Sequence, residues 1–264
     1  MAYGPRPHLH VLLVDIRKGR RRSRLPLRRL RGTALLRLAL ALGVILAVAL
    51  PGSASGTGPT NVSGTISTNT TWTLANSPYV MVGNVTVASG VTLTIEPGVV
   101  IKGDSWFRAL TVNGSLSAVG TGGQRITFTS TTETAPAQWL GITFNAGAGV
   151  STLKYVDARY AGGGVGGDGS GMLAVNGGTV TIEDATISSS SVSGIAMNGG
   201  TNGTAATLTV RRTKIENNGF YSTSNGDGIN ATNARIVLED SALWSNKDDG
   251  LDAGRHELLY TDSG

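Results

Sequence analysis

Residues 180–187 read Val-Thr-Ile-Glu-Asp-Ala-Thr-Ile, residues 208–215 read Leu-Thr-Val-Arg-Arg-Thr-Lys-Ile, and residues 236–243 read Ile-Val-Leu-Glu-Asp-Ser-Ala-Leu. In each stretch an alternating apolar pair is followed five residues later by a third apolar residue. Residues 153–160, Leu-Lys-Tyr-Val-Asp-Ala-Arg-Tyr, fit as a fourth copy. The second members of the pairs, at positions 155, 182, 210 and 238, are 27, 28 and 28 residues apart. A period of this length, built from short strands, predicts a solenoid in which each coil stacks on the next.

The rest of the chain after Gly56 also has the pattern of short strands. Short β-branched runs, closed by Gly, Asn, Ser or Asp, recur without a helical period, which predicts strands. The runs lie too close together for crossover helices. The scarcity of Asn-Gly pairs between matched alternating runs argues against an up-and-down sandwich, which is the alternative. We therefore predict an all-β fold, a single-stranded right-handed parallel β-helix, with Gly and Asn at its positive-φ corners. The expected strands are 79–87, 91–95, 99–102, 109–112, 126–129, 140–144, 153–156, 173–175, 180–182, 194–197, 208–210, 228–229 and 236–238.

Part of the sequence resembles a known family. Residues 90–103 (GVTLTIEPGVVIKG), 110–120 (LTVNGSLSAVG), 126–130 (ITFTS) and 139–144 (WLGITF) are similar to the first coils of secreted right-handed parallel β-helix proteins. These belong to the pectate-lyase-like superfamily, and the resemblance spans about residues 78–255. It implies the fold but no single function, because the superfamily holds lyases, hydrolases, adhesins and surface-layer-like proteins.

Composition narrows the function classes. The chain of 264 residues has a net charge of +5 and no Cys, which excludes disulfides, a thiol nucleophile and Cys-ligated metal sites. Residues 1–37 hold 11 Lys and Arg with one acid, whereas residues 38–264 hold 11 Lys and Arg with 16 acids. The expected folded part is thus acidic, and we expect no nucleic-acid partner.

The basic leader has the three parts of a secretory signal. A basic run (17–24) is followed by the apolar stretch Leu38–Leu50 and by small residues from Pro51. We predict a leader and signal peptide over 1–55 and a secreted or cell-surface protein, in contact with a membrane only through this segment if it stays uncleaved. Residues 56–77 are expected to form a polar N-terminal segment or cap, and residues 78–264 the β-helix. We expect that β-helix to be truncated, because no capping pattern follows Asp252.

One acidic region carries the candidate chemistry. Asp227-Gly-Ile and Asp249-Gly-Leu occupy equivalent positions of successive coils, so stacking should bring the two carboxylates together. Two close carboxylates repel, share a proton or hold a cation. The candidate site residues are Asp227, Lys247, Asp248, Asp249, Asp252 and Arg255, and the candidate calcium ligands among them are Asp227, Asp249 and Asp252.

Two functions remain open at this stage. The first is a structural or carbohydrate-binding module that has no catalysis and requires no cofactor, with a polysaccharide or cell-surface ligand. The second is a polysaccharide lyase or glycoside hydrolase that acts on acidic polysaccharide through the Asp cluster. Asp248-Asp249 resembles the paired aspartates of polygalacturonase-type hydrolases, but the accompanying Gly-His-Gly and Arg-Ile-Lys motifs have no counterpart. Asp-Gly turns also simply end the coils of such solenoids. Phe220-Tyr221 is the expected sugar contact, and Trp139 and Trp244 are expected to pack at strand ends.

Overall fold

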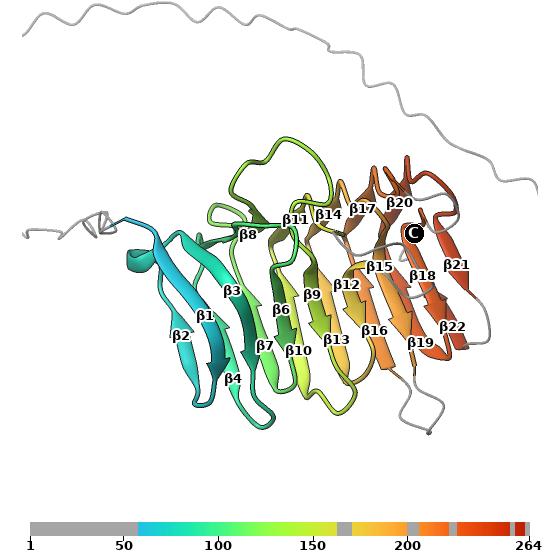
Figure 1. The fold of residues 1–264 in the computed structure, drawn as a ribbon. Helices are drawn as coiled ribbons and strands as arrows, with labels where there is room; N and C mark the ends of the chain where they lie inside the picture. The colour runs from blue at the N-terminus through green and yellow to red at the C-terminus, as the bar shows by residue number, and fades with distance from the viewer. Residues whose placement is uncertain (1–57, 163–170, 200–205, 222–225, 254–256, 262–264) are drawn as a thin grey trace, which may run out of the picture. The chain divides into compact units, whose positions relative to one another are not determined.

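The computed structural model describes residues 58–162, 171–199, 206–221, 226–253 and 257–261 (Figure 1). Nearly all regular structure in these ranges is β-strand, and their one helix is the short 3-10 helix η1 (Leu74–Asn76). No helix in these ranges is long and apolar enough to cross a membrane. The expected leader (1–55) lies outside the described residues.

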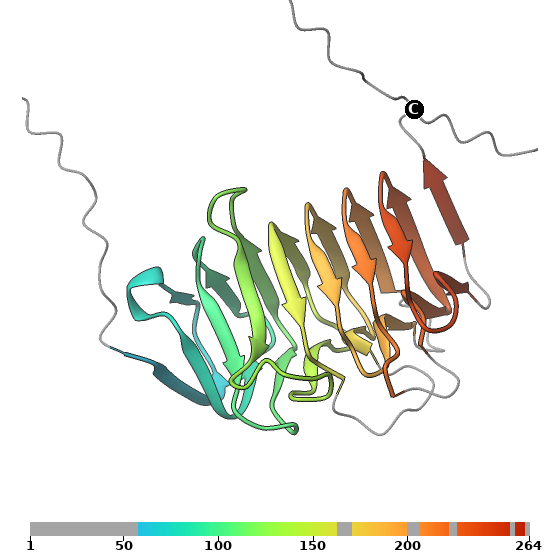
Figure 2. The same ribbon diagram turned by 90° about the horizontal axis from the view of Figure 1, so that it is seen from above.

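The strands form three parallel columns, which we call lanes A, B and C; each coil passes once through every lane. Lane A holds β5 (Val100–Gly103), β8 (Ile126–Ser130), β11 (Val156–Arg159), β14 (Thr186–Ser188), β17 (Lys214–Glu216) and β20 (Ala242–Trp244). Lane B holds β6 (Ala109–Val112), β9 (Gly141–Phe144), β12 (Gly171–Val175), β15 (Ser193–Asn198), β18 (Ile229–Thr232) and β21 (Leu251–Ala253). Lane C holds β2 (Thr70–Trp72), β4 (Thr92–Ile95), β7 (Ser115–Val119), β10 (Val150–Lys154), β13 (Thr179–Glu183), β16 (Ala206–Arg211), β19 (Ala234–Glu239) and β22 (Glu257–Thr261). The predicted all-β parallel β-helix is therefore confirmed, and Figure 2 shows the coils side by side along the stack.

The first coil joins lanes A and B. Strand β3 (Tyr79–Val87) pairs through its first half with β5 and through its second half with β6, while β1 (Thr60–Ile66) pairs parallel with β3. The parallel pairing thus begins within the segment expected to be a cap. At this end Trp72 stacks on Tyr79, with ring centroids 4.8 Å apart, and the Tyr79 hydroxyl accepts a hydrogen bond from the Thr73 N–H at 2.8 Å. These buried rings cover the first apolar rows.

The register confirms three of the four repeats and corrects the first. Ile182 pairs with Val210, and Val210 with Leu238, as predicted. Ile182 also pairs with Leu153, so Leu153 rather than Tyr155 continues this row, and Tyr155 divides the strand expected at 153–156. The apolar pattern fails here because Ser151 holds the inward position equivalent to Val180. Its buried hydroxyl accepts the Leu116 N–H at 2.9 Å, which satisfies a polar group in the core.

The core consists of in-register aliphatic rows. Strand residues alternate between buried and partly exposed, as expected for a sheet with one buried face. One row runs along lane A, where Phe128, Ala158, Ile187 and Ile215 follow one another on successive coils and are all buried. Each apolar side chain packs against its equivalent on the next coil, about 4.8 Å away. The apolar surface of these rows is therefore buried between coils.

The prediction that Gly and Asn supply the positive-φ corners is confirmed between lanes B and C, at Gly90, Gly147, Gly178 and Asn233, but it is wrong for the later corners from lane C to lane A. The corner from lane C to lane A is here called the tight corner. From β10 onward it has one or two residues between strands and uses Tyr155, Asp184, Arg212 and Asp240 at φ of 50°, 52°, 47° and 48°. Their spacings are 29, 28 and 28 residues. A left-handed conformation costs a non-Gly residue about 1–2 kcal/mol, so packing of the neighbouring coils must hold it. The benefit is a side chain at every corner, where Gly would have none.

Candidate functional site

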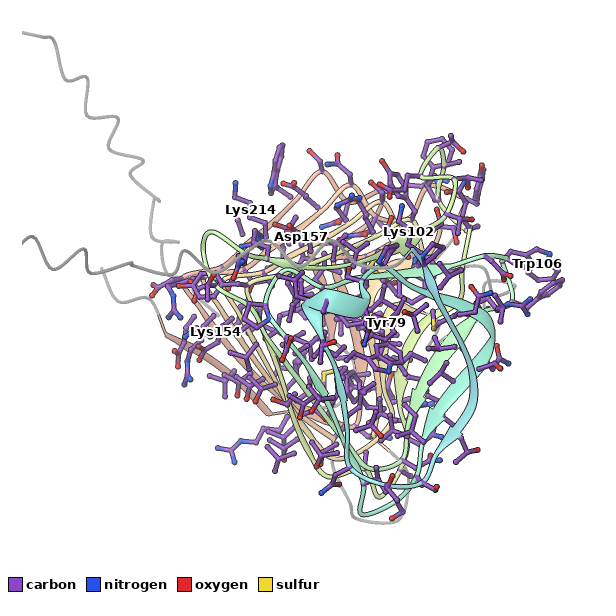
Figure 3. All side chains as sticks on the ribbon, turned by 90° about the vertical axis from the view of Figure 1, so that its left-hand side faces the viewer. Tyr79, Lys102, Trp106, Lys154, Asp157 and Lys214 are labelled. Atoms are coloured by element: carbon purple, nitrogen blue, oxygen red, sulfur yellow. The ribbon has the colours of Figure 1, made fainter. Side chains whose placement is uncertain are left out.

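The acidic region lies on the corner from lane A to lane B, which we call the loop edge. The acidic region consists of the segments between β17 and β18 and between β20 and β21. In the end-on view of Figure 3, Trp106 marks the loop edge and Lys154 the opposite end of lane A. The outward side chains Lys102 and Lys214 lie along lane A between these two corners.

Asp227 is the buried member of the acidic region, with only 2% of its surface exposed. Its Oδ1 accepts the Asp249 N–H at 3.1 Å, and its Oδ2 accepts Asn230 Nδ2 at 2.9 Å and the Ser193 hydroxyl at 3.4 Å. A buried carboxylate with three donors is satisfied and fixed in orientation. The coil stacking that the sequence predicts is present, because Gly228 N–H also donates to Asp249 O at 2.9 Å.

Asp248 and Asp249 are exposed and complete a group of three carboxylates with Asp227. One oxygen from each lies within 4.8 Å of the others. Carboxylates this close can hold a hard cation such as Ca²⁺, which takes six to eight oxygen ligands. Because these residues supply only part of that number and Asp227 already accepts three hydrogen bonds, water would have to provide the remainder.

The other candidate residues are placed differently. Asp252 lies exposed on β21, where it pairs with Asn230, and it is outside the group of three carboxylates. Lys247 is exposed; its backbone N–H donates to Asn218 O at 2.9 Å, and its Cβ lies near Gly219 and Gly226. Arg255 lies outside the described residues.

A column of glycines supports the loop edge. Gly194, Gly228 and Gly250 each precede an apolar lane B residue, and these apolar residues pair in register on successive coils, as the sequence predicts for Gly228 and Gly250. A Cβ on Gly228 would lie 2.5 Å from Gly250 O and 2.8 Å from Asn246 Nδ2. Only glycine leaves room for coils to stack backbone against backbone at this point.

An asparagine ladder lies beside these glycines. Asn218 and Asn246, 28 residues apart, stack so that Asn218 Nδ2 donates to Asn246 Oδ1 at 3.0 Å and to Ile187 O at 3.3 Å. Asn218 Oδ1 accepts the Ser190 N–H at 3.1 Å, and Asn246 Nδ2 donates to Ile215 O at 3.1 Å. The ladder satisfies backbone groups that turn away from the strands, so it fixes where the loops begin.

Exposed aromatic side chains gather at the loop edge. Phe220 and Tyr221, 63% and 61% exposed, lie edge to face with centroids 4.9 Å apart, in the segment that leads to Asp227. Trp106 and Phe107 form a similar pair between β5 and β6, with centroids 4.0 Å apart. Trp139 is fully buried, as predicted. The prediction that Trp244 would pack is wrong: it is 53% exposed, because inward Leu243 forces its neighbour outward.

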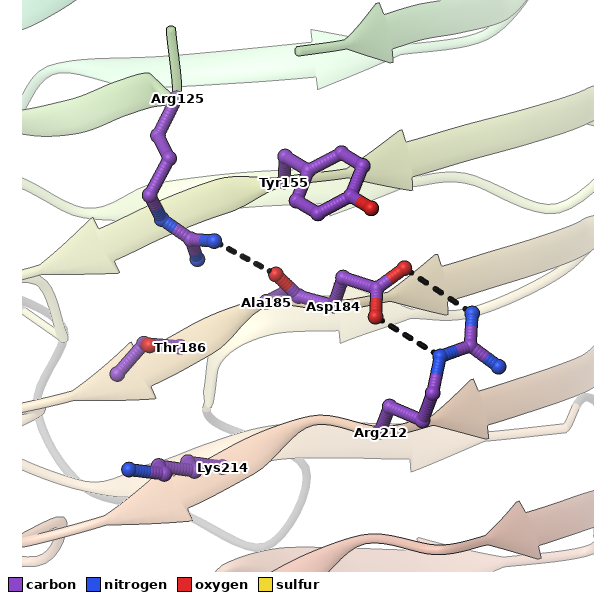
Figure 4. A pocket seen from close by; sticks show the side chains of 7 residues that line it. All are labelled: Arg125, Tyr155, Asp184, Ala185, Thr186, Arg212 and Lys214. Carbon is purple, nitrogen blue, oxygen red and sulfur yellow. Dashed lines mark hydrogen bonds and ion pairs between the residues drawn. The ribbon is translucent and has the colours of Figure 1, made fainter. Parts of the chain in front are cut away.

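The sequence reasoning missed a second polar site at the tight corner. Strand-end residues form a column of alternating charge, Lys154, Glu183, Arg211 and Glu239, in register on four coils. A depression of about 350 Å³ lies beside this column; Figure 4 shows its lining residues, Arg125, Tyr155, Asp184, Ala185, Thr186, Arg212 and Lys214. The 28-residue spacing of Glu183-Asp184, Arg211-Arg212 and Glu239-Asp240 was the available signal.

Ion pairs fix the charges of this corner. Arg212 donates to both oxygens of Asp184, at 2.8 and 3.0 Å, and lowers the pKa of Asp184. Lys154, whose Nζ lies 3.0 Å from Glu183 Oε2, lowers the pKa of Glu183. The carboxylate of Asp157 raises the pKa of Arg125. The corner therefore carries fixed charges at neutral pH.

Comparison with known proteins supports the fold. Residues 64–175 match the family model described as pectate-lyase like beta helix domain. No curated protein and no solved structure matches the chain. The matched residues include neither the three carboxylates nor most of the tight-corner depression, so this likeness bears on the scaffold and not on either site.

Proposed function

We propose that this parallel β-helix, whose residues 64–175 match the pectate-lyase-like family, is an exported module that binds polysaccharide at its loop edge without catalysis of its own. Export rests on the three-part leader of the sequence. Binding rests on the side chains that the fold presents at the loop edge.

The observation that carries the proposal is the pair Phe220 and Tyr221. Both rings are more than half exposed, and their flat faces suit the apolar face of a sugar ring. They lie in the same loop as Asp227, whose carboxylate lies beside those of Asp248 and Asp249 in the adjoining coil. Carboxylates can accept hydrogen bonds from sugar hydroxyls beside a stacking ring. The loop edge thus offers both kinds of contact that carbohydrate recognition uses.

Binding is tested by affinity electrophoresis and calorimetry with a panel of neutral and acidic polysaccharides. We expect the Phe220→Ala/Tyr221→Ala double variant to lose about tenfold in affinity, which corresponds to about 1.4 kcal/mol, within the range of aromatic contacts. Trp106→Ala/Phe107→Ala is the matched control, because it removes a second exposed aromatic pair several coils away. Equal losses in both variants would indicate nonspecific adhesion, and an absence of binding by the unaltered protein would overturn the proposal.

The alternative is hydrolysis or elimination through the carboxylates, which their proximity favours. It predicts new reducing ends or unsaturated products from acidic polysaccharide, and loss of turnover in Asp249→Ala with unchanged unfolding. We expect no product from the unaltered protein, with or without added Ca²⁺. Product that disappears in Asp249→Ala would replace the binding proposal with the catalytic one.

A further inference from the structure

The tight-corner depression has a donor pattern that the carbohydrate site at the loop edge does not explain. Its lining includes three cations, Arg125, Arg212 and Lys214, and a single carboxylate, that of Asp184. Thr186 pairs in register with Lys214, and both point outward from lane A, as Figure 4 shows. Most of the polar atoms around the depression are therefore hydrogen-bond donors.

The two guanidinium groups are already oriented by protein carboxylates. Arg125 uses Nε and Nη2 on the two oxygens of Asp157, at 2.9 and 2.8 Å, and donates Nη1–H to Asp184 O at 2.8 Å. Arg212 uses Nε and Nη2 on Asp184. In each guanidinium, the two N–H groups that could bind a further carboxylate in bidentate fashion are therefore already occupied. Each group still has a free N–H on Nη1, which can donate one hydrogen bond to a ligand.

Lys214 supplies the charge that is left over. It is exposed on β17, and no ion pair to it occurs among the residues that the structure describes. The neighbouring cations are matched by Asp157, Glu183, Asp184 and Glu239. Around the depression the remaining donors are therefore single hydrogens from separate coils, together with the ammonium group of Lys214, which has no ion pair among the described residues.

We propose that this depression binds a singly charged tetrahedral oxyanion, and that its ligand is the sulfate ester of a glycan. A sulfate ester accepts hydrogen bonds only, carries one charge, and directs three oxygens along different directions toward donors on different coils. A carboxylate has two oxygens in one plane and is best bound by the paired guanidinium edge, which is occupied here. Lys214, Thr186 and the free Nη1 hydrogen of Arg125 are the groups that contact it, whereas the Arg212 guanidinium lies on the other side of Asp184 (Figure 4). This inference deepens the proposed function, because it names one class of glycan that the module takes.

The probe is a sulfated galactan oligosaccharide, compared by calorimetry at low salt with its chemically desulfated form and with an oligogalacturonide of equal length. We expect the sulfated probe to bind best and its binding to weaken as salt rises. Lys214→Ala should weaken it about threefold, as for an exposed charged contact, and Thr186→Val/Lys214→Ala about tenfold. Lys102→Ala is the matched control, because it removes an outward cation of lane A that pairs with Glu133 and does not line the depression, so it should leave the affinity unchanged.

The outcomes separate this inference from the proposed function. If the neutral glycan binds and loses affinity in Phe220→Ala/Tyr221→Ala, but the sulfated probe gains nothing over its desulfated form, the loop-edge proposal stands and the sulfate site is overturned. Preference for the oligogalacturonide, or equal losses in Lys214→Ala and Lys102→Ala, also overturns it. If no glycan binds at all, both proposals fail. Circular dichroism of each variant confirms that the fold is retained before affinities are compared.

Discussion

The tight corner and the loop edge are the two ends of lane A, and they are built in opposite ways. At the tight corner one or two residues join β10 to β11 and the equivalent strands of later coils, and the left-handed corner residues recur every 28 or 29 residues. At the loop edge, the connection is short between β14 and β15, over 189–192, and long between β17 and β18, over 217–228. The tight corner is thus a repeated element, whereas the loop edge varies from coil to coil.

The difference explains where each kind of chemistry resides. A repeated corner places like positions about 4.8 Å apart, so opposite charges alternate along the stack and pair with one another. A variable edge breaks this repetition, because the loop over 217–228 is longer than the loop over 189–192 and therefore holds residues without an equivalent on that coil. The fixed corner favours a polar site made by several coils, and the variable edge favours a site made by one long loop.

The largest expected effect tests whether the loop edge has a rigid base. Gly228→Ala should lower the free energy of unfolding by about 3 kcal/mol, because the new Cβ would meet Gly250 O at 2.5 Å. Urea unfolding, read as the shift in midpoint at unchanged slope, measures it. Gly122→Ala is the control, since a Cβ there has no atom within 4 Å. Equal stability of the two variants would mean that the stacked backbones can separate freely.

A smaller loss is expected from the asparagine ladder. Asn218→Ala removes a side chain that is 2% exposed and leaves the Ser190 N–H and Ile187 O without their partner. We expect a loss of about 2 kcal/mol, typical of unsatisfied buried polar groups. In the variant, hydrogen exchange of the Ser190 amide should be faster than that of the amides in the core strands. Asn61→Ala, at an exposed position, is the control. If Asn218→Ala lowers the free energy of unfolding no more than Asn61→Ala does, the asparagine ladder has no structural role.

The sequence predicted the repeated parts of the molecule better than the variable ones. The 28-residue period identified the rows through Ile182, Val210 and Leu238, and the Gly-apolar pairs placed Asp227 beside Asp249. It failed at residues 151–155, because a buried Ser can hold an apolar position once its hydroxyl is hydrogen-bonded. Hydropathy alone cannot distinguish this case.

The candidate sites show a second limit. Which acid joins Asp227 depends on side-chain direction: Asp248 precedes the lane B strand, whereas Asp252 lies within it and points outward. The tight-corner depression was missed because its residues are ordinary strand-end charges, distant in sequence. Only the register between coils shows that Arg125, Asp184 and Lys214 surround one space.

Single ion pairs should contribute less than the packed elements, but more at the tight corner than at the loop edge. Asp157→Asn weakens a carboxylate held by two bonds from Arg125 and should lower the free energy of unfolding by about 1 kcal/mol. Asp104→Asn weakens the single contact with Arg108 at 2.6 Å, at the loop edge, and should lower it by about 0.3 kcal/mol. Urea midpoints of both variants give the comparison. A larger effect at Asp104 would show that a repeated corner gives no advantage to its ion pairs.

The smallest effect concerns the pH dependence of the charged column. The folded protein lowers the pKa of Glu183, mainly through Lys154, and that of Asp184, mainly through Arg212. A group whose pKa is lowered by folding stabilises the folded state above its unfolded pKa of about 4, and this stabilisation is lost as pH falls through the folded value. Glu183→Gln/Asp184→Asn should therefore be slightly less stable than the unaltered protein at pH 7, and the difference in the free energy of unfolding should shrink below about pH 4.

High salt at pH 7 should reduce the same difference, because these charges lie near the surface. Thermal unfolding at several pH values and two salt concentrations measures both trends. A difference that stays constant from pH 7 to pH 3 would mean that packing of these side chains, and not their charge, stabilises the tight corner.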